Sequence, residues 1–100
     1  MLFKNSAKKQ ILNDGSNTGY ELAVLEDFTL VELCITSTIE PHEVPFEATF
    51  YVLEGSGTCI IENNQVIMNK GDVLNVGSGL SRGWMNDNDS PLRILAIRKY

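Results

Sequence analysis

The chain has 100 residues, 43% apolar and 21% charged, which is the composition of an ordinary folded domain rather than of a disordered segment. Thirteen acidic and eight basic residues give a net charge of −5, so the clustered cations that bind nucleic acid or an anionic membrane surface are missing. No apolar run approaches the ~20 residues that span a bilayer, and we expect a single domain over residues 1–100.

Short extended segments, separated by turns rich in Gly and Asn, make up most of the chain. In chain order they are residues 8–12, 21–25, 31–36, 48–53, 58–62, 65–68, 73–76, 83–86 and 92–99. The two asparagines at 63–64 tolerate a positive φ and predict a tight hairpin between two of these segments. No window shows an amphipathic helix of ten or more residues, so the pattern predicts an all-β sandwich or barrel.

The two cysteines, Cys34 and Cys59, lie in apolar segments and lack the spacing of a metal site. They predict two buried, reduced thiols. The first residues carry no apolar signal segment, and with reduced thiols this favours a cytoplasmic location.

Two stretches resemble the two sequence motifs of the cupin family. Residues 51–57 (YVLEGSG) are similar to the centre of the first motif, G-x5-H-x-H-x3,4-E-x6-G, and residues 70–73 (KGDV) to the start of the second, G-x5-P-x-G-x2-H-x3-N. Both motifs align without a gap, and the resemblance covers about residues 31–97. It implies a double-stranded β-helix, which is a small jelly-roll barrel.

The resemblance also assigns four positions that ligate one metal ion in metal-binding cupins. They are occupied here by His42, Val44, Ala48 and Arg82, so three of the four ligands are absent. A transition metal needs three or more convergent donors, and Arg82 adds a permanent cation. We therefore expect no metal and no other cofactor. The alternative is a divalent transition metal held by His42 with Glu43 or Glu47, because the prolines at 41 and 45 can break strict alternation.

The other motif positions are turn residues. Gly55, Gly71, Gly79 and Asn86 match the family pattern, whereas Thr36 and Gly77 replace its first Gly and its Pro. We interpret the matching residues as structural.

Residues of one strand parity predict the lining of a pocket inside the barrel. Residues 42, 44, 48, 50 and 52 share one strand parity, so they face one side if the segment is extended, and in the family that side is the interior. The predicted ligand-binding residues are His42, Val44, Ala48, Phe50, Arg82 and Trp84. Arg82 has two interpretations: it holds a carboxylate or phosphate in the pocket, or it forms an internal ion pair with Glu43 or Glu47.

These observations predict a small cupin that lacks the usual metal and either binds a small organic ligand, which is an anion if Arg82 faces inward, or serves as a regulatory or interaction module. The alternative is an enzyme, either a metal-dependent dioxygenase or isomerase with atypical ligands, or a metal-free acid/base enzyme similar to sugar epimerases. In that case His42 is the candidate base, and Tyr51 or Tyr20 the candidate acid, provided that both reach one point of the pocket.

A homodimer is the expected oligomeric state. The segment 92–97 is apolar on both faces, and Leu25, Phe28 and Leu30 extend the candidate interface. A strand with one face in water does not normally carry apolar side chains on both faces.

Overall fold

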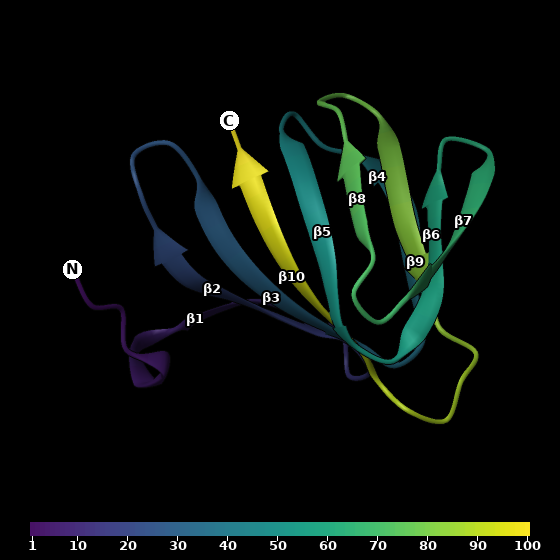
Figure 1. The fold of residues 1–100 in the computed structure, drawn as a ribbon, viewed down its shortest axis with the longest axis horizontal. Coiled ribbons are helices and arrows are strands. Elements are labelled where there is room, and N and C mark those ends of the chain that lie inside the picture. Colours follow the sequence, from purple (N-terminus) through teal and green to yellow (C-terminus); the bar gives the residue numbers. More distant parts are fainter.

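The computed structural model describes residues 1–100 and confirms the prediction of an all-β fold with almost no helix (Figure 1). One 3-10 turn, η1 (Asn5–Ala7), precedes ten strands. Their bounds are β1 (Lys9–Asn13), β2 (Thr18–Val24), β3 (Thr29–Ile35), β4 (Thr38–Glu43), β5 (Glu47–Glu54), β6 (Ser56–Ile61), β7 (Asn64–Asn69), β8 (Val73–Val76), β9 (Ser81–Met85) and β10 (Leu92–Lys99). No helix is long and apolar enough to cross a membrane.

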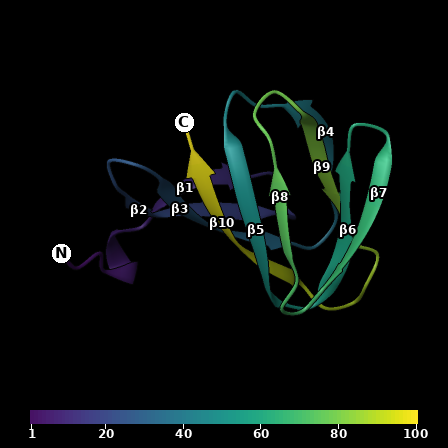
Figure 2. The same ribbon diagram turned by 45° about the horizontal axis from the view of Figure 1, so that its top comes forward.

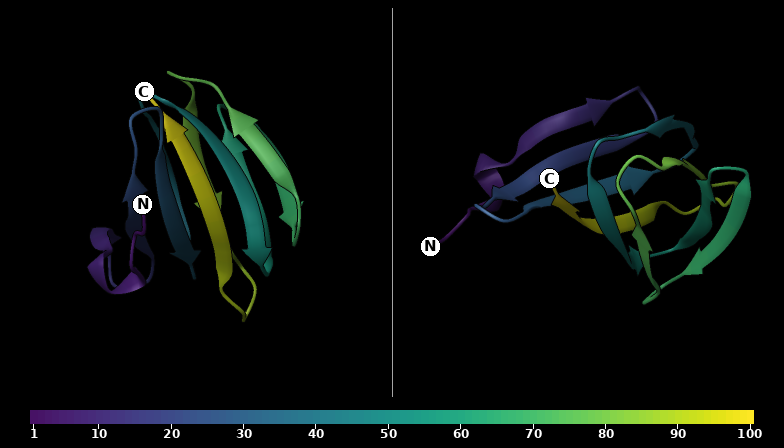
Figure 3. Two further views of the ribbon diagram at one scale, coloured as in Figure 1. Left: turned by 60° about the vertical axis from the view of Figure 1, so that its left-hand side comes forward. Right: turned by 90° about the horizontal axis from the view of Figure 1, so that it is seen from above.

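The strands form two antiparallel sheets that face each other and curve into a barrel. The larger sheet has the order β1-β2-β3-β10-β5-β8, and the smaller one β4-β9-β6-β7. Seen from above, the strands close into a ring, and β1 and β2 extend the larger sheet beyond it (Figure 3). This is the double-stranded β-helix, or jelly roll, that the sequence predicted.

The core lies between the sheets and follows the period of two that was read from the sequence. Ala48, Phe50 and Val52 of β5 are buried, as are alternate residues of β3 and β10. Cys59 is buried as predicted, whereas Cys34 is only half-buried, and both thiols are free.

β4 was not predicted from the sequence, and one predicted turn lies one residue earlier in the structure. β4 contains Pro41 and is an edge strand of the smaller sheet, where a residue without an N–H is tolerated. The hairpin between β6 and β7 is present, but its loop is Glu62-Asn63, because Ile61 pairs with Asn64. Glu62 has a φ of 53°, so it takes the left-handed conformation that we assigned to asparagine.

The barrel has two ends, which we name after their buried polar residues. At the asparagine end, Asn17 is fully buried, and its side chain forms hydrogen bonds with the connection between β3 and β4. Its Oδ1 accepts hydrogen bonds from the backbone N–H groups of Thr36 (2.9 Å) and Ser37 (3.1 Å). Its Nδ2 donates to the carbonyl of Thr38 (3.0 Å) and to the Asp14 carboxylate (2.9 Å). Both ends of the amide are therefore satisfied.

Asn86, the last residue of the second motif, completes the asparagine end from the connection between β9 and β10. Its Nδ2 donates to the carbonyls of Ile35 (2.8 Å) and Ser90 (3.0 Å), and its Oδ1 accepts from the Asn88 N–H (2.9 Å). The structural interpretation of this motif residue fits these bonds. In Figures 1 and 2 this end lies at the bottom, with the loop that leads into β10.

Exposed apolar side chains lie on the outer face of the larger sheet. Ile97 of β10, Tyr51 of β5 and Val73 of β8 are all exposed, and Leu95 of β10 is half-buried. The register pairs Leu95 with Tyr51 and Tyr51 with Val73, so the row crosses three strands. The homodimer, with its expected interface at Leu25, Phe28, Leu30 and the segment 92–97, stays a prediction.

Candidate functional site

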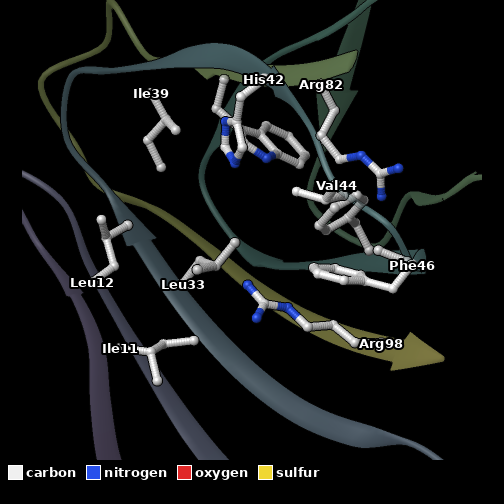
Figure 4. A pocket seen from close by; sticks show the side chains of 12 residues that line it. Ile11, Leu12, Leu33, Ile39, His42, Val44, Phe46, Arg82 and Arg98 are labelled. Carbon is white, nitrogen blue, oxygen red and sulfur yellow. The ribbon is translucent and has the colours of Figure 1, made fainter. Parts of the chain in front are cut away.

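A cavity of about 280 Å³ lies between the two sheets of the barrel (Figure 4). All six predicted ligand-binding residues line it: His42, Val44, Ala48, Phe50, Arg82 and Trp84. Six further residues complete the wall: Ile11, Leu12, Leu33, Ile39, Phe46 and Arg98. The wall is mostly apolar and contains no acidic side chain.

The segment that joins β4 to β5 supplies one side of the cavity through alternate residues. His42, Val44, Phe46 and Ala48 all line it, so the predicted parity continues through the turn. The N–H of Gly79 donates to the carbonyl of Val44 (2.9 Å), which holds this turn against the β8–β9 loop. We call this part of the barrel, with Arg82 and Arg98, the arginine end.

Arg82 is the buried charge of the arginine end, with 4% of its surface exposed. Its Nε donates to the Leu80 carbonyl (3.2 Å) and its Nη2 to the Gly77 carbonyl (2.6 Å), whereas its buried Nη1 has no partner. Gly77 occupies the motif position of Pro, and its carbonyl anchors the guanidinium. Arg82 forms no ion pair with Glu43 or Glu47. The two ion pairs of the structure join Arg93 to Glu32 and to Glu54.

Burial changes the proton affinities around this residue. It lowers the pKa of the Arg82 guanidinium, and the positive charge of Arg98 lowers it further, whereas nearby Cys59 acts in the opposite direction. The guanidinium nevertheless stays protonated at neutral pH. Burial raises the pKa of the Cys59 thiol to about 12, so this thiol is neutral and is not an activated nucleophile.

Arg98 and Phe46, which also line the cavity at the arginine end, were not predicted from the sequence. The Cζ atom of Arg98 lies 4.8 Å from the centroid of the Phe46 ring, and that of Arg82 lies 5.9 Å from it. Arg98 follows the inward-facing residues Ile94 and Ala96 at the same period of two, so the parity of β10 could have identified it.

His42 lines the cavity and points its ring into it (Figure 4). Its Nδ1 lies 3.1 Å from the Glu40 carbonyl oxygen. Because a carbonyl only accepts, Nδ1 carries the proton in the neutral ring and Nε2 is left as an acceptor. The structure does not bring the candidate acids to His42: Tyr51 lies on the outer face of the sheet, and the Tyr20 hydroxyl accepts a bond from Gln10 away from the cavity.

The residues present do not fit the metal ion that many proteins with this pattern bind. The structure contains no group of three His, Cys, Asp or Glu side chains that could hold a metal. Glu43 and Glu47, the alternative ligands, do not line the cavity, and the Glu47 carboxylate accepts from Asn75 (2.8 Å). Val44 and Ala48 offer no donor atoms at the remaining positions.

Comparisons with known proteins agree with this architecture. The family described as Cupin domain matches residues 30–98. Among solved structures, the polyketide cyclase RemF from Streptomyces resistomycificus has a TM-score of 0.82 at 18% identity, covering 99% of this chain and 78% of that one. A predicted oxalate decarboxylase from Thermotoga maritima scores 0.81 at 20% identity (99% and 98%), and KdgF from Halomonas sp. scores 0.81 at 16% identity (100% and 94%). At such identities the likeness concerns the fold alone. Among curated proteins nothing matches.

Proposed function

The chain belongs to the cupin family, and from that premise we propose that its barrel binds a small organic anion without the help of a metal ion. The observation that supports this is the Arg82 guanidinium, which is buried in the cavity wall with its Nη1 unpartnered and no carboxylate paired to it. A buried cation without a counter-charge is costly in a folded protein.

An anion in the cavity would remove that cost. Each charge-assisted hydrogen bond contributes ~1.5–3 kcal/mol, or roughly a tenfold to hundredfold gain in affinity. The guanidinium is planar and pre-shaped for a carboxylate or a phosphate. Its bonds to Gly77 and Leu80 already fix its orientation, so little side-chain entropy remains to be lost on binding.

The cavity also indicates the size and body of the ligand. Its volume of about 280 Å³ is at the lower limit of the roughly 300–1,000 Å³ usual for ligand pockets, which favours a small molecule. Leu33, Ile39 and Val44 offer apolar contacts, and the Phe50 and Trp84 rings pack edge to face with centroids 5.1 Å apart. An acid with a short hydrocarbon body matches such a wall.

Thermal unfolding in the presence of acetate, benzoate and inorganic phosphate tests this function. We expect at least one of these anions to raise the Tm of the wild type, and Arg82→Ala to abolish the rise while the variant stays folded. Arg93→Ala is the matched control, because Arg93 is paired with Glu32 and Glu54 outside the cavity and its removal should leave the rise intact. The proposal is wrong if no anion moves the wild-type Tm and Arg82→Ala merely lowers it.

A second candidate function is acid/base catalysis on such an anion, favoured by the His42 ring in the cavity wall, whose Nδ1 lies 3.1 Å from the Glu40 carbonyl oxygen. Its Nε2 is free to accept a proton in the cavity, and Arg82 would stabilise a negative charge on the bound molecule. In D₂O, NMR would then detect exchange of a C–H proton of a bound carboxylate with the wild type and not with His42→Gln. Equal exchange in both proteins would assign His42 a binding role only.

A further inference from the structure

We infer that the ligand is a dianion of the dicarboxylate class: a short carbon body with two anionic groups, one held by Arg82 and the other by Arg98. This inference rests on the proposed function and narrows its ligand class. The observations that carry it are the placement of two guanidinium groups around one aromatic ring, the lack of acidic side chains in the cavity wall and the lack of an ion pair at either arginine.

Phe46 separates the two cations in the wall of the cavity (Figure 4). Its ring centroid is 5.9 Å from the Arg82 Cζ and 4.8 Å from the Arg98 Cζ, so the Cζ atoms are separated by no more than the sum of these distances. Two carboxylates joined by a short chain can reach both cations from within the cavity. A single phosphate, by contrast, concentrates its charge at one point.

No group of this chain neutralises the pair. The protein has thirteen acidic residues and a net charge of −5, but none of the acids lines the cavity. Neither arginine forms an ion pair, whereas Arg93 contacts two glutamates. Like charges repel across a wall of low polarity, and the effect of Arg98 on the pKa of Arg82 has the sign of this repulsion. A monoanion would neutralise one cation and leave the other, whereas a dianion would neutralise both.

The two cations differ in depth, and this sets the orientation of the ligand. Arg82 is buried, whereas Arg98 is half-buried and contacts the Phe46 ring, which in turn packs against Tyr100 with centroids 5.2 Å apart. The contact with an aromatic face holds the Arg98 guanidinium in place. One carboxylate is therefore desolvated at Arg82, and the second, at Arg98, stays in contact with solvent.

Calorimetric titration with matched pairs of acids tests the inference. The probes are malonate, succinate and glutarate, each compared with the monocarboxylate of the same chain length, and inorganic phosphate. We expect the best dicarboxylate to bind about tenfold more tightly than its monocarboxylate partner, because the second anionic group gains a charge-assisted contact. Arg98→Gln should remove this preference and weaken monocarboxylate binding less than Arg82→Gln does, whereas Arg82→Gln should weaken the binding of both classes of acid.

The control is Arg93→Gln, which should keep both the affinity and the preference, and circular dichroism should show that each variant is folded. If mono- and dicarboxylates bind the wild type equally, or if Arg98→Gln keeps the preference, the dianion inference is wrong while the proposed function stands. Phosphate binding tighter than that of every dicarboxylate would also overturn it. If no anion binds, the proposed function itself is wrong.

Discussion

At the asparagine end of the barrel, both oxygen and nitrogen of the Asn17 and Asn86 amides have partners, although both residues are buried. At the arginine end, Arg82 is buried to the same degree, but one of its nitrogens has no partner, and a second guanidinium lies nearby without a counter-charge. The two ends are joined by the same strands: β9 contains Arg82 near its start and ends at Met85, directly before Asn86.

The contrast separates polar groups that stabilise the fold from polar groups that are available to a ligand. A satisfied buried network fixes one arrangement of the backbone, because any alternative leaves its donors and acceptors unpaired. An unsatisfied buried cation has the opposite effect, since it lowers the stability of the ligand-free protein and increases the binding free energy of an anion that pairs with it. Mutations at the two ends should therefore differ in the size of their effect on stability.

The largest loss of stability is expected for Asn17→Ala. It leaves the Thr36 and Ser37 N–H groups and the Thr38 carbonyl without their partner. At ~1–3 kcal/mol for each unsatisfied group, the free energy of unfolding should fall by about 3 kcal/mol or more, and the Tm by roughly 10–20 °C. Urea unfolding measures it. Asn88→Ala, which removes exposed hydrogen bonds to Ser56, is the control and should cost less than ~1 kcal/mol. Equal losses in the free energy of unfolding would show that the buried hydrogen bonds of Asn17 contribute no more to stability than the exposed bonds of Asn88.

Two glycines with nearly equal φ angles allow the same substitution to be compared at the two ends. Gly55 (φ 80°) lies at the asparagine end, where a Cβ would stand 2.4 Å from the Pro91 carbonyl oxygen, and Gly79 (φ 83°) lies at the arginine end with nothing within 4 Å. Gly79→Ala should cost only the backbone strain, about 1–2 kcal/mol. Gly55→Ala adds a clash with backbone and should cost ~1–3 kcal/mol more. Chemical denaturation of both variants in parallel checks this, and a Gly79→Ala loss as large as that of Gly55→Ala would contradict it.

Arg82→Met should have a small effect on stability in a buffer free of carboxylates and phosphate. The variant removes a buried charge that has no counter-charge, but it also removes the hydrogen bonds to the Gly77 and Leu80 carbonyls. Because the two effects oppose each other, the free energy of unfolding should fall by no more than ~1–2 kcal/mol, which is less than for Asn17→Ala. The same variant should lose every anion-dependent increase in Tm. A loss of stability comparable to that of Asn17→Ala would show instead that Arg82 has a structural role like that of the asparagines.

The smallest effect is expected in acid, at the asparagine end. The hydrogen bond from the Asn17 N–H, with further bonds from the Asn17 side chain and Ser16, lowers the pKa of Asp14 below its ordinary value of 3.8. The carboxylate therefore contributes stability that is fully present well above pH 3.8 and is lost as the pH falls through the lower pKa of the folded state. Thermal unfolding from pH 6 to pH 2 should show a steeper fall for the wild type than for Asp14→Asn, and parallel curves would exclude this contribution.

The barrel and six residues of its cavity could be predicted because motif spacing and strand parity are local properties of the sequence. Val44 and Ala48, at ligand positions of the family, predicted an apolar wall, and the structure places both there. The side-chain direction of Tyr51 follows from the same parity, since its buried neighbours at 50 and 52 face inward. A pairing of Tyr51 with His42 in one pocket therefore contradicts the alternation that identified the pocket.

The remaining part of the site depends on contacts between distant segments. Ile11 and Leu12 reach the cavity because β1 pairs with β2 at the edge of the larger sheet, and nothing in their own segment marks them as lining residues. The partner of Arg82 could not be predicted either. The candidates were glutamates of the nearby β4–β5 segment, but the Arg82 guanidinium bonds to backbone carbonyls of the β8–β9 loop. Every residue has a backbone carbonyl, so residue types do not indicate which carbonyl accepts a hydrogen bond from Arg82.

The position of β1 at the edge of the larger sheet has a consequence for how a molecule enters the cavity. β1 pairs with β2 alone, its register shifts between Gln10 and Leu12, and four of its five residues are exposed. A strand held on one side detaches from its sheet at a lower free-energy cost than a central strand. Because Ile11 and Leu12 form part of the cavity wall, transient fraying of β1 would open the cavity while the core stays intact. The amides of β1 would then exchange with solvent before those of β10, and an occupant that contacts Ile11 and Leu12 would slow that exchange.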